Sequence, residues 1–117
     1  MVKKLTKDEF SKLIFDFENK KEWDYKGNKP SILKFTAEWC NPCKTMIPIL
    51  EEISNEYDGK IDIYNIDVED EDELSSYFKV RSVPTMVYLP VGEKPQTSIG
   101  SITKANLIKK MEEILKV

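Results

Sequence analysis

The amino-acid sequence predicts an α/β fold built on a partly parallel sheet. Short apolar segments alternate along the chain with segments whose apolar residues recur at helical spacing, which is the pattern of βαβ units. The last two expected strands are separated only by a short turn at Gly92, so we expect an antiparallel hairpin at one edge of the sheet. The chain has 117 residues and no linker, and residues 1–117 are expected to form one domain.

The N-terminal part of the chain is expected to form one helix and two strands. Thr6 and Glu9 have the spacing of a capping box, and the apolar residues that follow predict a helix over residues 7–19. The apolar segment 31–36 predicts a strand. A short extra strand is expected over residues 22–25.

The rest of the chain predicts three further helices and three further strands. Residues 41–57 place their apolar side chains on one helical face, and Pro48 is expected to kink this helix. The remaining elements are expected as a strand over residues 61–66, a helix over 71–78, strands over 85–89 and 96–99, and a last helix capped by Thr103.

Composition and charge exclude several classes of function. The formal net charge is −3, which gives no electrostatic footprint for nucleic acid. The chain has neither a basic amphipathic stretch nor an apolar run of the roughly 18 residues that span a bilayer. It contains no histidine, which excludes Ser-His-Asp and Cys-His catalysis. We therefore expect no nucleic-acid partner and no membrane contact.

The only two cysteines, Cys40 and Cys43, form a C-x-x-C motif where a strand ends and a helix begins. In a first helical turn this spacing separates the Cα atoms by about 5 Å, which a disulfide tolerates. A disulfide that closes so short a loop would stabilise the folded protein by only about 2 kcal/mol. The spacing therefore favours a chemical role over structural support. There are two alternatives. The cysteine pair is inert, or it supplies half of a metal site that two chains share, because two cysteines cannot fill a zinc site alone.

The position of each cysteine predicts its role. Free N–H groups and the helix dipole favour an anion at the start of a helix, so the pKa of Cys40 should fall below the ordinary value of ~8.5. Cys40 would attack a substrate disulfide. Cys43, expected to be the more buried thiol, would then attack the Cys40 sulfur and release the reduced substrate.

Around this motif the sequence resembles the thioredoxin family. The resemblance covers most of the chain and rests on A-E-W-C-N-P-C-K at residues 37–44, N-I-D at 65–67, V-R-S-V-P-T at 80–85, Pro48 and Gly100. It implies the thioredoxin fold, in which a central mixed sheet of four to five strands is flanked by helices on both faces.

The resemblance also implies a substrate-docking surface beside the cysteines. The Val83-Pro84 peptide bond would be cis and would leave the Val83 backbone free to pair with an extended substrate segment. The docking residues would be Trp39, Pro42, Val83, Pro84, Ile66 and Gly100, and ordinary core packing is the alternative for each.

Lys34 departs from the family pattern, which has a buried aspartate at this position behind the second cysteine. A neutral Lys34 could act as the base for Cys43, whereas a charged Lys34 would stabilise a thiolate and make the couple more oxidising. Alternatively, Lys34 bends toward water and pairs with a carboxylate such as Asp62 or Glu38.

Together these observations predict a protein-disulfide reductase acting through the Cys40/Cys43 couple, with Lys34, Asn41 and Lys44 modulating it. Its partners would be protein disulfides and a reductase or other dithiol donor. No metal is expected, and no cofactor beyond the redox-active disulfide, because no nucleotide-binding loop is present. A more oxidising thiol oxidase or isomerase and a non-catalytic binding module are the alternatives. We expect a monomer. Since the N-terminus lacks the apolar segment of a signal peptide, we also expect a cytoplasmic protein, or an exported protein whose signal was removed.

Overall fold

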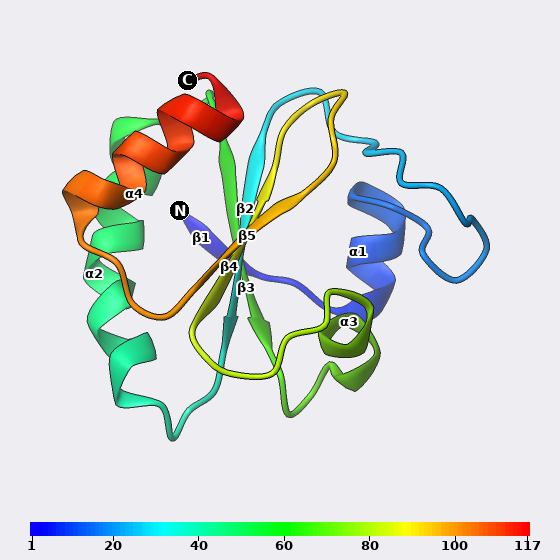
Figure 1. Ribbon diagram of the computed structural model, residues 1–117, viewed down its shortest axis with the longest axis horizontal. Helices are drawn as coiled ribbons and strands as arrows, with labels where there is room; N and C mark the ends of the chain where they lie inside the picture. Colours follow the sequence, from blue (N-terminus) through cyan, green and yellow to red (C-terminus); the bar gives the residue numbers. More distant parts are fainter.

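A five-stranded mixed sheet lies at the centre of the protein in a computed structural model that describes residues 1–117 (Figure 1). β1 (Val2–Lys4) and β2 (Ser31–Thr36) pair with β3 (Asp62–Asp67) in parallel, whereas β4 (Thr85–Leu89) runs antiparallel to both β2 and β5 (Gln96–Ile99). The predicted mixed sheet and its edge hairpin are confirmed. The strands follow the spatial order β1, β3, β2, β4 and β5.

Helices cover both faces of the sheet, as the resemblance implied. In Figure 1, α1 (Lys7–Leu13) and α3 (Asp72–Tyr77) lie on one side of the sheet, and α2 (Asn41–Glu56) and α4 (Lys104–Lys110) lie on the other. Side chains of the predicted capping box, Thr6 and Glu9, close the start of α1 as expected. The last helix, α4, has a π-helical continuation, η1 (Met111–Leu115).

Each face of the sheet has its own hydrophobic core. Because side chains alternate across a strand, Leu33 and Phe35 of β2 pack in the core under α1 and α3, while Ile32 packs in the core under α2 and α4. The first core is rich in aromatic residues and the second in aliphatic ones. The same alternation directs Lys34 toward the second face, beneath α2.

Two expectations in the N-terminal region are wrong. Residues 22–25 form no strand; Trp23 and Tyr25 instead pack as loop residues against the aromatic core. The fifth strand is β1, which has no strand pattern in the sequence because two of its three residues are lysines. The first helix also ends at Leu13 rather than at residue 19, and the carbonyl of Ile14 beyond it accepts the N–H of Lys26 instead of continuing the helix.

The capping box allows a direct test of how α1 is stabilised. Thr6→Ala removes the hydroxyl that accepts the Glu9 N–H, so we expect the free energy of unfolding to fall by about 1 kcal/mol. Chemical denaturation measures this change. Thr97→Ala, at an exposed position of β5, is the control and should change stability by less than about 0.5 kcal/mol. Equal effects of the two substitutions would show that the cap does not stabilise the protein.

Candidate active site

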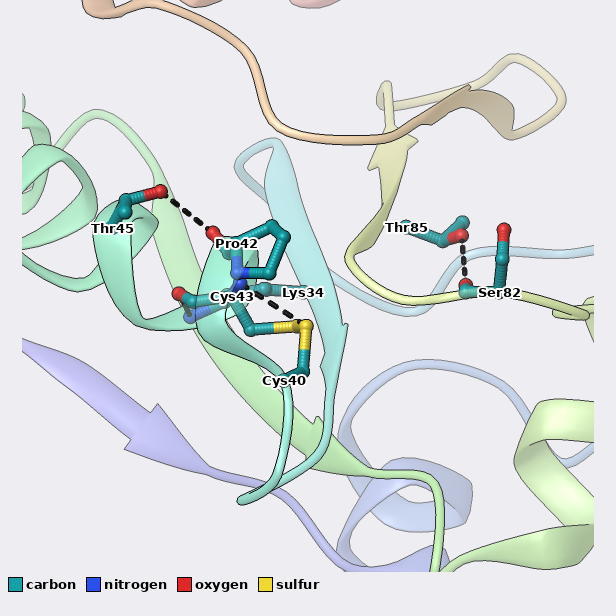
Figure 2. Close-up of a disulfide and its surroundings, with 7 residues drawn as sticks. All are labelled: Lys34, Cys40, Pro42, Cys43, Thr45, Ser82 and Thr85. Carbon is teal, nitrogen blue, oxygen red and sulfur yellow. Dashed lines mark hydrogen bonds between the residues drawn. A yellow bond between two sulfur atoms is a disulfide. The ribbon is translucent and has the colours of Figure 1, made fainter.

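The two cysteines are joined by a disulfide at the start of α2, and their Cα atoms lie 5.3 Å apart (Figure 2). Cys40 is the N-cap residue of the helix, and Cys43 lies in its first turn. Pro42 fits between them because the first turn of a helix requires no N–H donor. The spacing expected from the sequence is therefore confirmed.

Cys40 takes the place that a serine or aspartate oxygen usually occupies at a helix cap. The backbone N–H of Cys43 donates a hydrogen bond of 3.1 Å to the Cys40 Sγ atom. This N–H and the positive end of the helix dipole both favour negative charge at the Cys40 sulfur, so they favour the thiolate form of a reduced Cys40. Cys43 is the more buried cysteine by only a small margin, with exposed fractions of 1% for Cys43 and 3% for Cys40.

A loop with an unpaired backbone lies beside the disulfide. The Val83-Pro84 bond is cis, as expected, and Val83 packs against the two cysteines. The N–H and C=O of Val83 form no hydrogen bond within the protein, whereas the preceding carbonyl, that of Ser82, accepts the Thr85 hydroxyl at 2.7 Å (Figure 2). The loop therefore presents a free backbone edge next to the sulfur atoms.

Exposed apolar side chains surround this edge. Trp39 is 67% exposed, and Pro42 is exposed as well, whereas Pro84 is buried and shapes the loop from beneath. The Gly100 N–H donates to the Pro84 carbonyl at 2.8 Å, and the φ angle of 91° at Gly100 favours glycine. The neighbouring Ile99, which is 76% exposed, was not among the predicted docking residues, although an isoleucine in an otherwise polar strand is a signal in the sequence.

Ile66 requires a correction. It was expected in the docking surface, but it has no exposed surface and belongs to the aromatic core. Its neighbour across the parallel β2–β3 pair is Phe35, and both side chains point to the face that α1 and α3 cover. Ile66 therefore supports the sheet and is unavailable to a docked substrate.

Lys34 is buried directly behind Cys43. Its side chain is 1% exposed, and its Nζ atom donates a 2.8 Å hydrogen bond to the backbone carbonyl of Cys43. Burial lowers the pKa of Lys34, and no carboxylate pairs with it. The alternative in which Lys34 reaches water and pairs with Asp62 or Glu38 is wrong, because α2 covers this face of β2; Asp62 pairs with Lys29 instead.

A cavity of about 460 Å³ lies between Lys34 and the protein surface. Asn65 also lines it, and the Asn65 Oδ1 atom is buried without a hydrogen-bond partner. Asn65, a residue of the N-I-D motif that was not predicted to belong to the site, is the β3 neighbour of Lys34. Lys44 lies at the exposed edge of the cavity, and Asn41 is exposed at the start of α2. The lining residues are Lys34, Thr36, Ala37, Glu38, Lys44, Ile47, Asn65 and Asp67.

The chemistry available here is thiol–disulfide exchange. No cluster of three or more His, Cys, Asp or Glu side chains is arranged to hold a metal ion. No helix has the length and apolar character needed to cross a membrane. A disulfide that closes the first turn of a helix, with a hydrogen bond to its first sulfur and a free backbone edge beside it, defines a dithiol–disulfide oxidoreductase.

Comparison with known proteins agrees with this class. The family model for thioredoxin matches residues 1–113. A thioredoxin from Borreliella burgdorferi is 41% identical over 108 residues, covering 90% of this chain and 92% of that protein. A thioredoxin from Staphylococcus epidermidis is 35% identical over 100 residues, covering 86% and 91%. The solved structure of a chloroplastic thioredoxin z has the same fold, with a TM-score of 0.80, 24% identity and coverage of 99% and 96%.

The chain therefore belongs to the thioredoxin family. It is a protein-disulfide reductase that acts through the Cys40–Cys43 couple. Members of this family require no external cofactor, and membership implies disulfide-containing protein substrates and reductase partners in general terms.

Proposed function

We propose that Cys40 is the attacking thiol and Cys43 the resolving thiol of this reductase. The observation that carries the assignment is the hydrogen bond from the Cys43 N–H to the Cys40 Sγ atom at the start of α2. This donor and the helix dipole stabilise negative charge on Cys40 and not on Cys43, so Cys40 forms the thiolate more readily.

The exchange then takes place in two displacements. The Cys40 thiolate attacks one sulfur of the substrate disulfide, a mixed disulfide forms, and the other substrate sulfur leaves as a thiolate. Cys43 loses its proton and attacks the Cys40 sulfur, which releases the second substrate thiolate. The substrate gains two electrons, and the protein loses them as its disulfide closes. Because Cys40 starts as a thiolate, the protein releases one proton, that of Cys43, and solvent supplies the second proton of the reduced substrate.

The docking surface in this proposal consists of Trp39, Pro42, Val83 and Gly100, with Pro84 holding the loop in shape. The unpaired N–H and C=O of Val83 support it, because an extended substrate segment can pair with them as an added strand. Such pairing recognises backbone, so it accepts many substrate sequences. Asn41 and Lys44 modulate the couple from the exposed side of the cysteines.

We further propose a monomeric, one-domain protein that acts in the cytoplasm, without a metal or a nucleic-acid partner, and is reduced by a thioredoxin reductase or another dithiol donor. The single sheet with its two cores supports one domain over residues 1–117. A reductase suits a compartment in which thiols are kept reduced, which supports the cytoplasm.

Trapping of the mixed disulfide tests the assignment of the two cysteines. Reduced Cys43→Ser protein is expected to form a stable covalent complex with a disulfide-bonded protein such as insulin, because nothing resolves the bond to Cys40. Mass spectrometry under non-reducing conditions measures the adduct. Cys40→Ser is the matched control and should give little adduct. Equal adducts from both variants would overturn the assignment, and non-covalent retention alone would indicate a binding module.

The reduction potential distinguishes a reductase from the more oxidising alternatives. Equilibration against glutathione buffers should give a value below about −200 mV, nearer to the −270 mV or so of a disulfide reductase. A higher value would indicate a thiol oxidase or isomerase.

A further inference from the structure

Lys34 is a cation without a counterion in the disulfide state of the protein. Its side chain lies on the face of β2 that packs under α2, and its only hydrogen bond goes to the neutral backbone carbonyl of Cys43. Burial of an ammonium group without an opposite charge is costly. The other buried polar residues, Ser31, Ser54 and Thr85, are all uncharged. Lys34 is therefore the one charged side chain inside the protein.

An anion forms in the helical turn that Lys34 contacts in only one redox state. Both sulfur atoms are neutral in the disulfide, whereas the reduced pair carries a thiolate at the end of α2 that Lys34 contacts. Figure 2 shows Lys34 beside Cys43, on the side of β2. The attraction between ammonium and thiolate thus acts on the reduced protein alone, and in a buried site solvent screens it little.

We propose that Lys34 sets the redox equilibrium of the cysteine pair: its buried ammonium group stabilises the thiolate of the reduced state and makes the couple more oxidising. Lys34 is a positioning residue here and exchanges no electrons. On reduction by a dithiol donor, the pair gains two electrons and one proton, its S–S bond breaks, and a Cys40 thiolate and a Cys43 thiol form while Lys34 stays protonated. This inference rests on the proposed function, in which the thiolate is the reactive group.

Other charges face Lys34, but solvent reaches them. Glu38, Lys44 and Asp67 line the cavity beside Lys34, and Glu51 of α2 lines a smaller space with it. Glu38, Lys44 and Glu51 are exposed and Asp67 is partly exposed, so water screens these groups in both redox states. None of the carboxylates pairs with Lys34, whose one hydrogen-bond partner, Cys43, lies three residues from Cys40 in the same helical turn. The pKa of Lys34, lowered by burial, is consistent with this lack of an anionic partner.

The test compares the glutathione equilibrium of the unchanged protein with that of Lys34→Met, whose side chain is apolar and similar in length. We expect the equilibrium constant to shift about tenfold toward the disulfide, which corresponds to a couple about 30 mV more reducing. The pKa of the Cys40 thiol, followed by the ultraviolet absorbance of the thiolate, should rise in the same variant. Lys34→Asp should shift both quantities further in the same directions.

Two further variants test whether the shift in the equilibrium constant depends on the charge of Lys34 itself. Lys60→Met removes the same charge at an exposed position beyond the far end of α2 and should leave the equilibrium constant within about twofold. If Lys34→Met fails to fold, Lys34→Gln replaces it in the experiment. Lys34→Gln keeps a polar side chain without the charge and should show the same shift of the equilibrium constant. An unchanged equilibrium constant in the Lys34 variants, or an equal shift in Lys60→Met, would overturn the inference.

The same proteins separate this inference from the proposed function. If the Cys43→Ser variant traps a mixed disulfide but the Lys34 variants keep the original equilibrium, only the inference on Lys34 fails. If no mixed disulfide forms through Cys40 in any background, the assignment of the cysteines fails instead.

Discussion

Cys40→Ser is expected to lower the rate of protein-disulfide reduction by on the order of 10³-fold or more, as removal of a nucleophile does in other enzymes. A serine hydroxyl stays protonated at neutral pH and cannot form a disulfide, so neither displacement can begin. The serine oxygen can still accept the Cys43 N–H at the helix cap, so the fold should be kept. The rate of insulin reduction with dithiothreitol as the electron donor measures the loss.

The control for this experiment is an exposed serine position away from the site. Ser76→Ala, on the exposed side of α3, should reduce insulin at the rate of the unchanged protein. Unfolding curves of the reduced Cys40→Ser variant establish that it is folded. A folded variant that kept more than about a tenth of the activity would show that Cys40 is not the nucleophile.

Lys34→Met is expected to raise the free energy of unfolding of the disulfide form by about 1–4 kcal/mol at neutral pH, because an apolar side chain replaces a buried charge without a partner. Thermal or chemical unfolding of the oxidised protein measures the gain. The reduced protein should gain less, since its thiolate already compensates Lys34. Lys60→Met should change stability by less than about 0.5 kcal/mol. A less stable oxidised Lys34→Met variant at neutral pH would contradict this expectation.

The gain in stability should depend on pH in a defined direction. Burial lowers the pKa of folded Lys34 below its ordinary value of 10.5. Below the lowered pKa the side chain is charged in both folded and unfolded protein, so the full cost of burial is present. As the pH rises through the lowered pKa toward 10.5, the folded protein releases its proton first and this cost disappears. The stability difference between Lys34→Met and the unchanged protein should therefore shrink across that window.

The sequence predicted the central elements of the fold because their patterns are strong. Residues 31–36, 85–89 and 96–99 form β2, β4 and β5 with the expected bounds, since each is a short segment bounded by turn residues. The disulfide and the cis bond before Pro84 were also predicted, the first from the spacing of the cysteines and the second from the resemblance. Local pattern and motif decide these features.

Other features depended on packing that no local pattern reveals. β1 forms from Val2–Lys4 because the edge of β3 is available, not because the segment resembles a strand. Ile66 belongs to a motif beside the active site, yet the alternation of β3 directs it into the aromatic core. The surroundings of Lys34 could not be predicted for the same reason. A lysine in a strand reaches either water or the protein interior, depending on which element covers that face of the strand.

The helix cap at Cys40 has a consequence for the course of the reaction. The sulfur that reacts is also the atom that accepts the first side-chain hydrogen bond of α2. Sulfur keeps lone pairs as a thiolate, in a mixed disulfide and in the closed disulfide, so it can accept this bond in every intermediate. The backbone at the start of α2 then has no reason to rearrange during turnover. The cap of α2 is therefore kept while the cysteine sulfur atoms separate and rejoin and the substrate binds and leaves.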